Sequence, residues 1–353
     1  MDPATLALIA FVGIILLCAS AHITAPTDSR TLNKLFSDVM DHPVTREAID
    51  NIFKANALLG MLTDIEDGKD YLSGGNRISV KVRLGLDTSV GSTEGYDPLD
   101  TTPQEQITTA LFRTAEHYAN VTVSFRELEQ SGGEEGLNGL LADAVEGALG
   151  SLRDNINVAL WKDGTGNNSK DLFGLAAFFP ADPTTGTVGG VSRASNTAWR
   201  SNVEQSATGA VVTDLRTLYN ECTDGDEVPT LGMCTTTAYE LYEVKVAATP
   251  QFSPVIVEKG PRTGDVGFDY LRYKAARLVL DKGATGYGGG TNENIVLLNL
   301  KALKLYVYRE ADFTPTEMVK HPGQFAYVGQ IRWHGNLVPL QLRRHGVVYD
   351  ITA

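Results

Sequence analysis

The histidine, serine and glycine residues of this chain do not fall into the spacings that common catalytic sites use. None of its six histidines stands in an HExxH arrangement, which would place two zinc ligands on one face of a helix. No serine lies in a GxSxG elbow. The segment TVGGVS lacks the GxGxxG spacing, and nothing matches the phosphate-binding pattern GxxxxGKS/T. We therefore predict that the protein is not an enzyme and that it holds no metal or cofactor.

Two short charged runs are candidates for contacts. The acidic run DGDE at 224–227 resembles the start of a calcium-binding loop, but the later glycine and bidentate glutamate are missing, so we assign it to a loop. The basic run Arg343, Arg344 and His345 is either a solvated strand end or a contact with an acidic neighbour or enclosed nucleic acid. We keep Arg343 and Arg344 as candidates for contacts between subunits.

The composition is that of a globular protein. With 353 residues, 42% of them hydrophobic and 21% charged, the chain is long enough for two or three domains. Its formal net charge of −13 argues against a general nucleic-acid binder, but permits a protein whose inner surface encloses nucleic acid. The three cysteines show no metal-ligand spacing. We expect Cys222 and Cys234 to be free buried thiols; a disulfide between them is the alternative.

Residues 134–161 form the longest stretch with helical periodicity. Its apolar residues recur at steps of three or four: Leu137, Leu141, Val145, Leu149, Leu152, Ile156 and Leu160. Glu134 and Glu135 stand at the start, where the helix dipole favours anions. Four internal glycines weaken the helix propensity, so the helix needs a packing partner. We predict a long spine helix laid against a sheet; an ordinary amphipathic core helix is the alternative.

The segment 71–131 predicts an extended hairpin. Apolar and polar residues alternate from Ile78 to Leu86 and again from Val121 to Phe125, as in half-buried strands. A turn-rich tip, GYDPLDTTPQ, lies between them. A hairpin this long with little core behind it is marginally stable alone, so we expect it to lie on another surface, such as a neighbouring subunit. The candidate contact residues of the tip are Tyr96, Asp97, Pro98 and Leu99.

The N-terminal segment leaves three interpretations open. Residues 4–21 carry no charge and just reach the length and hydropathy of a transmembrane helix. The run Ala19-Ser20-Ala21 resembles a signal-peptide cleavage site, although a basic start is missing. A bacterial lipoprotein would need a small residue just before Cys18, but Leu17 stands there. A hydrophobic arm buried between subunits is the third interpretation. Residues 31–66 predict one or two short helices.

The second half of the chain predicts mixed helices and strands. A glycine-rich loop follows the long helix and is closed by Trp199 and Arg200, which we also keep as contact candidates. Residues 203–310 predict an α/β segment, with helices over TDLRTLYNECTD and TTAYELYEVKVAA and strands around them. The stretch 325–351 predicts strand, turn and strand. Gly335-Asn336 would form the turn, and Pro339 would confine the second strand to a sheet edge.

Taken in order, several segments resemble the major capsid proteins of tailed bacteriophages, over about residues 30–353. The glycine-rich motif of that family is matched by Gly186, Thr187, Val188, Gly189, Gly190 and Arg193. Its Trp-Arg-Asn trio is matched by Trp199, Arg200 and Asn202, with Ser201 inserted. Its CTDGxExPD motif is matched by Cys222, Thr223, Asp224, Gly225, Glu227 and Pro229, with Thr230 in place of the acid. Its terminal motif is matched by Trp333, Gly335, Asn336, Leu337, Arg343, Arg344, Gly346 and Val347.

The resemblance implies the α+β capsid fold shared by tailed phages and herpesviruses. Its parts would be an N-terminal arm at 1–70, an extended hairpin loop at 71–131, a peripheral domain with the spine helix at 132–219, an axial domain at 220–312, and a return to the peripheral domain at 313–353. The apolar residues 4–21 depart from the family pattern. We expect them to form an arm buried at subunit contacts rather than a membrane span. We also expect a separate scaffolding protein or none.

The function that the resemblance implies is mechanical. Many copies of a major capsid protein would self-assemble, as hexamers and pentamers, into an icosahedral or elongated shell around double-stranded viral DNA. Further partners would be scaffolding, portal and cement proteins; the DNA would be enclosed without sequence-specific binding, and no membrane partner is expected. The protein would be found in the virion after assembly in the host cytoplasm. Two alternatives stay open: an encapsulin-like compartment shell, and a signal-bearing or membrane-anchored surface protein.

Overall fold

The computed structural model describes residues 57–64, 68–97, 99, 102, 104–130, 134–206, 211–247, 271–281, 284 and 293–352. The apolar segment 4–21, most of the helical segment 31–66, and Pro98 lie outside the described residues. The chain forms two compact units, which are described separately below. Among the described residues, the smaller unit contains 120–148 and 315–331, and the larger unit contains most of the remainder.

A six-stranded sheet forms the centre of the larger unit. Its strands are β7 (Asn202–Gln205), β8 (Leu231–Cys234), β9 (Leu271–Tyr273), β10 (Ala276–Leu280), β11 (Glu293–Leu298) and β15 (Gly346–Ile351). They lie in the order β7-β15-β11-β8-β10-β9. The central strands β8 and β11 are buried along nearly their whole length, as expected for hydrophobic runs such as IVLL that are covered on both faces.

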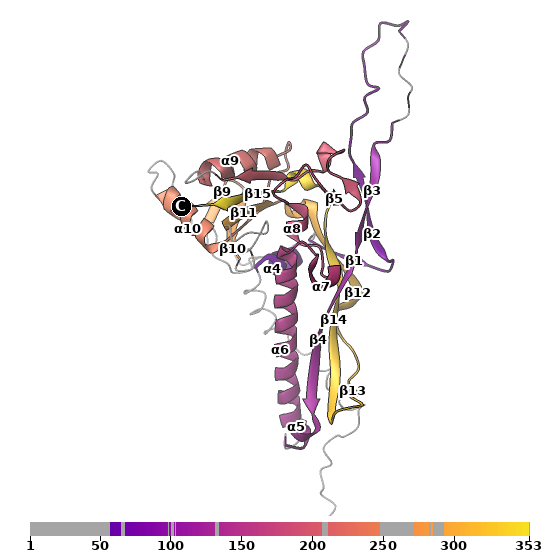
Figure 1. Ribbon diagram of the computed structural model, residues 1–353, viewed down its shortest axis with the longest axis vertical. Helices are drawn as coiled ribbons and strands as arrows, with labels where there is room; N and C mark the ends of the chain where they lie inside the picture. The colour runs from indigo at the N-terminus through magenta and orange to yellow at the C-terminus, as the bar shows by residue number, and fades with distance from the viewer. Residues whose placement is uncertain are drawn as a thin grey trace, which may run out of the picture. The chain divides into compact units, whose positions relative to one another are not determined.

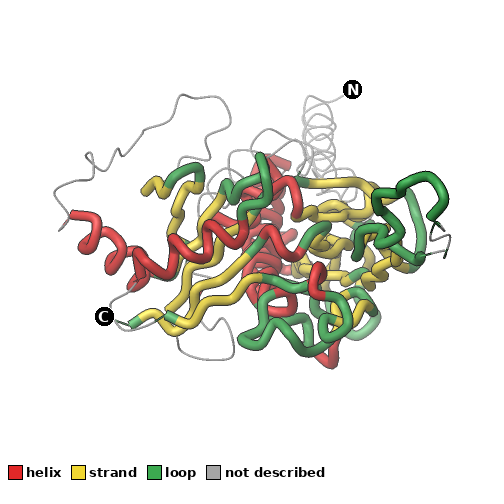
Figure 2. The backbone as a smooth tube through the Cα atoms, turned by 90° about the horizontal axis from the view of Figure 1, so that it is seen from above, coloured by secondary structure: helices red, strands yellow, loops and turns green. Residues whose placement is uncertain are grey.

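Two helices cover one face of this sheet. They are α9 (Val211–Cys222) and α10 (Thr236–Ala247), and both were predicted from the sequence. Figures 1 and 2 show them running along the strands. Apolar residues of α9, α10 and one face of the sheet form a continuous core that includes Leu215, Leu218, Tyr242, Leu278, Ile295, Leu297 and Val348. This core fixes the position of both helices on the sheet.

The C-terminal segment differs from the prediction. The predicted turn at Gly335-Asn336 is wrong, because both residues lie inside one continuous strand, β14 (Ala326–Pro339). A side chain at position 335 would put its Cβ 2.5 Å from the Tyr306 carbonyl oxygen. The glycine therefore allows the backbone of Tyr306 to lie close to β14 and does not form a turn. Pro339 is the last residue of β14 and ends it. The segment 313–353 also divides between two sheets, because β15 belongs to the six-stranded one.

A second sheet of the described residues has five strands. It consists of β1 (Lys69–Leu72), β12 (Leu303–Pro315), β14 and β13 (Val319–Lys320) in that order, with β4 (Ala115–Ser124) also paired to β14. In the larger unit β1 runs parallel to β12. The prediction that Val121 and Val123 belong to the returning arm of the hairpin is wrong, because β4 pairs with β14 instead. Their alternation reflects a strand with one buried face, which sequence periodicity cannot assign to a partner.

The predicted spine helix is confirmed as α6 (Glu134–Trp161). In the larger unit, Leu152, Ile156 and Leu160 are buried. The indole Nε1 of Trp161 donates to Asp281 Oδ2 at 3.3 Å. The same carboxylate oxygen accepts from the backbone N–H of Leu58 in α4 (Ala57–Asp64) at 3.2 Å. Asp281 therefore ties the end of the spine helix and α4 to the end of β10.

The smaller unit has its own local organisation around α5 (Phe125–Gln130). Ser124 and Glu127 form a capping box: the Ser124 N–H donates to Glu127 Oε2 at 2.9 Å, and the Glu127 N–H donates to Ser124 Oγ at 3.2 Å. The Phe125 ring lies 5.0 Å from the ring of Tyr327. Among the residues that the structure describes, no helix is long and apolar enough to cross a membrane.

Candidate functional site: the hairpin and its root

The hairpin consists of β2 (Arg77–Arg83) and β3 (Ile107–Arg113); among the described strands, these two pair only with each other. The register runs from Arg77 opposite Arg113 to Arg83 opposite Ile107. One face of the pair is buried and carries Ile78, Val82, Ala110 and Phe112. The opposite face of β2 presents exposed residues, among them Arg77, Lys81 and Arg83. The hairpin therefore has an apolar side that packs on its own protomer and a basic side that faces solvent.

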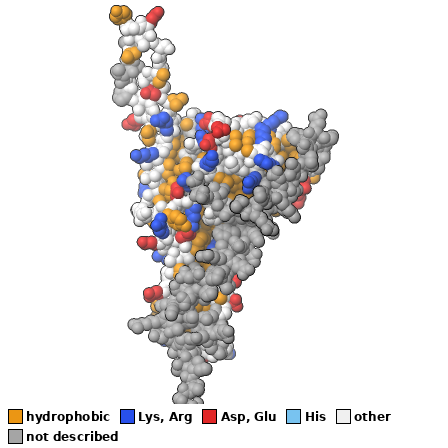
Figure 3. Space-filling model, turned by 180° about the vertical axis from the view of Figure 1, so that it is seen from behind, with side chains coloured by type: hydrophobic (Ala, Val, Ile, Leu, Met, Phe, Trp, Pro, Cys, Tyr) orange, Lys and Arg blue, Asp and Glu red, His pale blue; other side chains and the backbone are white. Residues whose placement is uncertain are grey.

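Beyond the paired strands, the tip exposes large apolar side chains. Tyr96 is 103% exposed and Leu99 is 70% exposed, and Leu86 and Val90 of this segment are exposed as well. Asp97, another predicted contact residue, accepts a hydrogen bond from the Glu94 N–H at 3.2 Å. Figure 3 shows apolar and acidic side chains spaced along the hairpin. The structure thus places Tyr96 and Leu99 on the surface of the protomer, and their role in subunit contacts stays a prediction.

The root of the hairpin, at Leu111 to Arg113 of β3, contacts the rest of the protomer at Gly189. This glycine lies between β5 (Thr187–Val188) and β6 (Val191–Ser192), with a positive φ of 60°. Its carbonyl oxygen accepts from the Leu111 N–H at 2.8 Å. A Cβ at this position would lie 2.9 Å from both Ala110 Cβ and Phe112 Cζ. The glycine-rich motif of the sequence therefore allows the close approach of β3.

Arg113, the last residue of β3, anchors the hairpin root to the loop that follows the spine helix. Its Nη2 donates to the carbonyl oxygens of Gly164 and Asp171, both at 2.7 Å, and its Nη1 donates to the carbonyl oxygen of Ser169. The guanidinium also lies 4.6 Å from the centre of the Phe173 ring. Burial lowers the pKa of Arg113 from its ordinary value, and the negative charge of Asp171 opposes this effect. Three carbonyl oxygens in one fork give this contact a defined geometry.

The loop held by Arg113 has a left-handed backbone. In α7 (Gly166–Ser169), Asn167, Asn168 and Ser169 have φ values of 51°, 56° and 61°. The Ser169 N–H donates to the Thr165 carbonyl oxygen at 3.1 Å, which closes one left-handed turn. A left-handed helical conformation costs an L-residue about 1–2 kcal/mol, and asparagine adopts it more readily than serine. The turn is therefore strained, and the contacts of Arg113 lie at both of its ends.

Asn336 joins the same root to β14 and is fully buried. Its Nδ2 donates to the Arg113 carbonyl oxygen at 2.5 Å, and its Oδ1 accepts from the Phe173 and Leu337 N–H groups, both at 2.8 Å. One amide side chain thus links the end of β3, the loop after the spine helix and β14. The conformation of all three segments at the root depends on it.

Trp199 and Arg200, two of the predicted contact residues, form hydrogen bonds within the protomer. The Trp199 side chain is only 1% exposed, and its Nε1 donates to the Val188 carbonyl oxygen at 3.1 Å. Arg200 Nε donates to the Arg193 carbonyl oxygen at 2.7 Å. Arg193 Nη2 in turn donates to the Phe178 carbonyl oxygen at 2.8 Å, at the end of α8 (Leu175–Phe178). These residues brace the glycine-rich loop on which the hairpin root rests.

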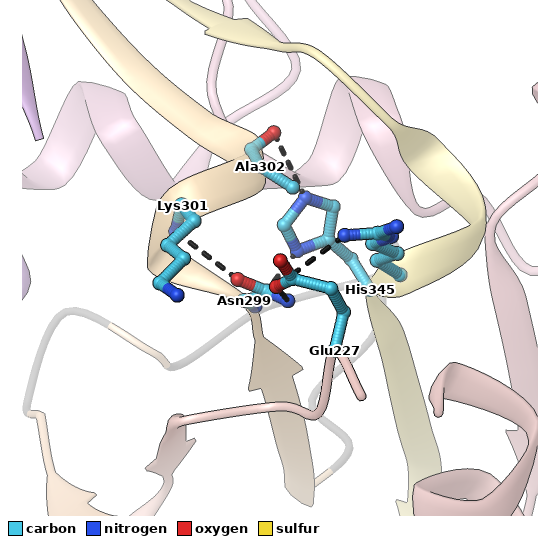
Figure 4. Close-up of polar contacts among 6 residues, drawn as sticks. Glu227, Asn299, Lys301, Ala302 and His345 are labelled. Carbon is cyan, nitrogen blue, oxygen red and sulfur yellow. Dashed lines mark hydrogen bonds and ion pairs between the residues drawn. The ribbon is translucent and has the colours of Figure 1, made fainter. Parts of the chain in front are cut away.

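The basic run at 343–345 meets the acidic run at 224–227 within the same chain. Arg344 Nη1 lies 3.4 Å from Glu227 Oε2, and Arg343 Nη1 lies 3.9 Å from Asp224 Oδ2. Figure 4 shows Glu227 beside Asn299 and His345. Both arginines therefore contact acidic residues of their own chain, and their role in contacts between subunits stays a prediction.

His345 is fully buried beneath these ion pairs. Its Nδ1 accepts from the Asn299 backbone N–H at 3.1 Å, so its other nitrogen, Nε2, carries the proton and faces the Ala302 carbonyl oxygen at 3.3 Å (Figure 4). Burial lowers the pKa of His345 to about 4; the hydrogen bond to Ala302 acts in the opposite direction, and the charge of Arg344 adds to the lowering. The imidazole is a neutral connector between the C-terminal segment and the loop at 299–302.

The cysteines behave as buried apolar side chains. Cys222 and Cys234 are free and buried, as predicted, and burial raises the pKa of Cys222 to about 12. Among the described residues, no group of three or more His, Cys, Asp or Glu side chains is arranged to hold a metal ion. These thiols therefore have the environment of core residues rather than of nucleophiles.

The solved structures that the chain resembles include capsids of tailed phages. The "Cyanophage A-1(L) capsid asymmetric unit" is similar over 86% of this chain and 94% of that chain, with a TM-score of 0.62 and 18% identity. The chain has the major capsid fold of tailed phages. The capsid of Myoviridae phage XM1 gives a TM-score of 0.51 at 11% identity, covering 82% of this chain and 92% of that one. The capsid of a native GTA particle gives 0.51 at 10% identity, covering 81% and 88%.

No protein-family model matches the chain, and no curated protein matches it in sequence. The capsid fold is thus recognised through the arrangement of its elements, and the α+β architecture expected from the sequence is confirmed. Sequence reasoning found the glycine-rich, tryptophan and arginine motifs but missed what they do. Arg113 stood inside an unremarked LFRTAE segment, and the partners of Asn336 come from segments far away in the sequence.

Proposed function

We propose that this chain is a major capsid protein, which assembles in many copies into the closed shell around a double-stranded DNA genome. The observation that carries the proposal is the fold match along nearly the whole of a capsid chain. We propose the virion as its location, after assembly in the host cytoplasm.

The hairpin supports this proposal. Within the part of the chain that the structure describes, its strands pair only with each other, and its tip exposes Tyr96 and Leu99 to solvent. In the proposed shell the tip lies on a neighbouring subunit, which removes these side chains from water. Each such contact is weak, and many of them together hold a closed shell by multivalency. We keep the tip residues as contact candidates; Trp199 is not among them, because its side chain is buried in the protomer.

The charge of the chain fits a container for DNA. A formal net charge of −13 suits a shell that encloses nucleic acid without gripping it. Hexamers and pentamers of the chain would form the shell, with scaffolding, portal and cement proteins as further partners. The arm at 1–70, the hairpin loop at 71–131, and the peripheral and axial domains remain our proposed division of the chain. Residues 4–21 would form an arm buried at subunit contacts.

Sedimentation of the expressed protein tests the assembly step. The double variant Tyr96→Ser and Leu99→Ser should fold as the wild type does, because both side chains are exposed in the protomer, but should sediment as small species. Deletion of residues 1–23 should also damage assembly. Normal shells from either variant would remove that segment from the proposed contacts.

The cargo of the shells tests the genome step. Nuclease-resistant DNA inside particles formed in the presence of the other phage proteins would support the proposal. An enzyme that co-purifies inside DNA-free shells would assign the chain to an encapsulin-like compartment. Recovery of the protein only in membranes, or with a cleaved leader, would favour the surface-protein alternative.

A further inference from the structure

The direction in which the hairpin leaves the protomer must be set at its root. No other strand of the described residues pairs with β2 or β3 and guides them. The root contacts are the Leu111 N–H on the Gly189 carbonyl oxygen, the carbonyl of Arg113 on Asn336, and the guanidinium of Arg113 on the loop after the spine helix. The first two are short backbone-directed contacts near the strand itself. Each of them fixes a single backbone group of β3. The third joins one side chain of β3 to three carbonyl oxygens of the loop after the spine helix, so it acts as a brace that resists rotation about the strand.

The loop at the far end of this brace is the left-handed turn at 167–169. Arg113 contacts the carbonyl oxygens of Gly164 before the turn, of Ser169 at its end and of Asp171 after it. L-residues leave a left-handed backbone when nothing holds them in it. The guanidinium fork supplies donors to three carbonyl oxygens at once, which a lysine ammonium on a flexible stem does not reproduce in the same geometry.

We propose that Arg113 is a positioning residue for assembly: it holds the left-handed turn in place and thereby fixes the direction in which the hairpin projects toward a neighbouring subunit. This inference rests on the proposed shell function for its consequence, but not for its geometry. A hairpin that leaves its root in one direction presents Tyr96 and Leu99 in one place. A hairpin with a loose root must be ordered at every contact it makes, which weakens each contact.

Hydrogen exchange of the unassembled full-length chain tests the brace directly. The variant Arg113→Lys keeps the charge and removes the fork. The Ser169 and Lys170 amides, which close the left-handed turn, should then exchange about tenfold faster. The matched control is Arg77→Lys, since Arg77 is the cross-strand partner of Arg113 and its side chain is exposed. Equal exchange in the two variants would overturn the proposal.

The direction of the hairpin is measured by spin-label distances. One label is placed at exposed Lys81 on β2 and the other at exposed Lys301, after Cys18→Ser removes the one cysteine that lies outside the described residues. The distance distribution should be narrow in the wild type and in Arg77→Lys, and broad in Arg113→Lys. A narrow distribution at the wild-type distance in Arg113→Lys would contradict the role, even if that variant were less stable.

A second variant separates positioning from loss of folding. Glycine adopts φ near 60° without strain, so Ser169→Gly should keep the turn left-handed without help. Added to Arg113→Lys, it should restore part of the exchange protection and of the narrow distribution; failure to restore either would overturn the proposed coupling. Shell yield from the same variants is read last. If the wild type forms no shells, the proposed shell function is wrong. Hydrogen exchange and the spin-label distances still test whether Arg113 holds the turn and the hairpin in place.

Discussion

The guanidinium of Arg344 lies 3.4 Å from the carboxylate of Glu227, which joins two sequence motifs that are far apart in the chain. Arg343 and Asp224 form a second, more exposed pair beside it at 3.9 Å. Asn299 Nδ2 contacts the same Glu227 carboxylate at 3.5 Å, and His345 lies buried beneath. The acidic and basic motifs therefore act together as one junction between the C-terminal segment and the segment after α9.

The two ion pairs of this junction should differ in strength. The side chains of Arg344 and Glu227 are 20% and 37% exposed, whereas those of Arg343 and Asp224 are 57% and 52% exposed. We expect Arg344→Ala to lower the free energy of unfolding by about 1 kcal/mol and Arg343→Ala by less than about 0.5 kcal/mol, because solvent screens the exposed pair. Urea denaturation at low and high salt measures both. A larger loss for Arg343→Ala would contradict this order.

Stability should fall in mild acid because of His345. Its pKa is lowered to about 4 in the folded chain, against an ordinary value of 6.5, so the unfolded chain binds more protons between these two values. Its contribution is complete above pH 6.5 and is lost as the pH falls toward 4. Each pH unit in this window is worth about 1.4 kcal/mol, which makes the total on the order of 3 kcal/mol.

The variant His345→Gln tests this assignment. Glutamine offers an oxygen to the Asn299 N–H and an N–H to the Ala302 carbonyl oxygen, but it does not titrate. The unfolding free energy of this variant should change less between pH 7 and pH 4.5 than that of the wild type. His321→Gln, at an exposed position, is the control and should leave the wild-type pH dependence intact. An unchanged slope in His345→Gln would mean that another group carries the effect.

Alanine substitutions at Gly189 and Gly190 should distinguish the effect of a steric clash from the effect of backbone strain. Both glycines have positive φ, but a Cβ at 189 would lie 2.9 Å from Ala110 and Phe112, whereas a Cβ at 190 would meet nothing within 4 Å. Gly189→Ala should therefore destabilise the chain by about 1–3 kcal/mol more than Gly190→Ala, through overpacking at the hairpin root. Thermal unfolding compares them. Equal losses would show that strain alone matters and that the approach of β3 tolerates a methyl group.

Asn336 should be intolerant of a change that keeps its size. Aspartate has no Nδ2 donor for the Arg113 carbonyl oxygen and would place a charge in a fully buried site. We expect Asn336→Asp to cost about 3 kcal/mol or more at pH 7. The exposed Asn120→Asp is the matched control and should cost under about 0.5 kcal/mol. Chemical denaturation measures the free energy of unfolding of both variants. A small loss for Asn336→Asp would contradict the role given to the Asn336 amide.

The sequence predicted the elements better than their partners. The four-residue steps from Leu137 to Leu149 identified the spine helix, and alternation identified β2 and β4, because periodicity records which face of an element is buried. Periodicity does not record what covers that face, so β4 was assigned to the hairpin. Gly335 predicted a turn, while its actual role, room for the Tyr306 carbonyl, depends on a strand elsewhere in the chain.

The candidate site shows the same limit. Exposed tip residues were identified from their composition, but Trp199 was taken for a contact residue although it is buried against its own loop. The role of Arg113 depends on three carbonyl oxygens, and carbonyl oxygens are present at every residue. No residue type in the sequence marks such an acceptor. The root of the hairpin therefore became visible only in three dimensions.

Negative-stain electron microscopy of the full chain, expressed alone and with the neighbouring phage genes, then purified by sedimentation, tests the central claim most directly. A shell subunit with the capsid fold should give closed particles or rings of capsomers. The Tyr96→Ser and Leu99→Ser double variant should give folded, small species under the same conditions. A monodisperse monomer in both expressions would contradict the shell function.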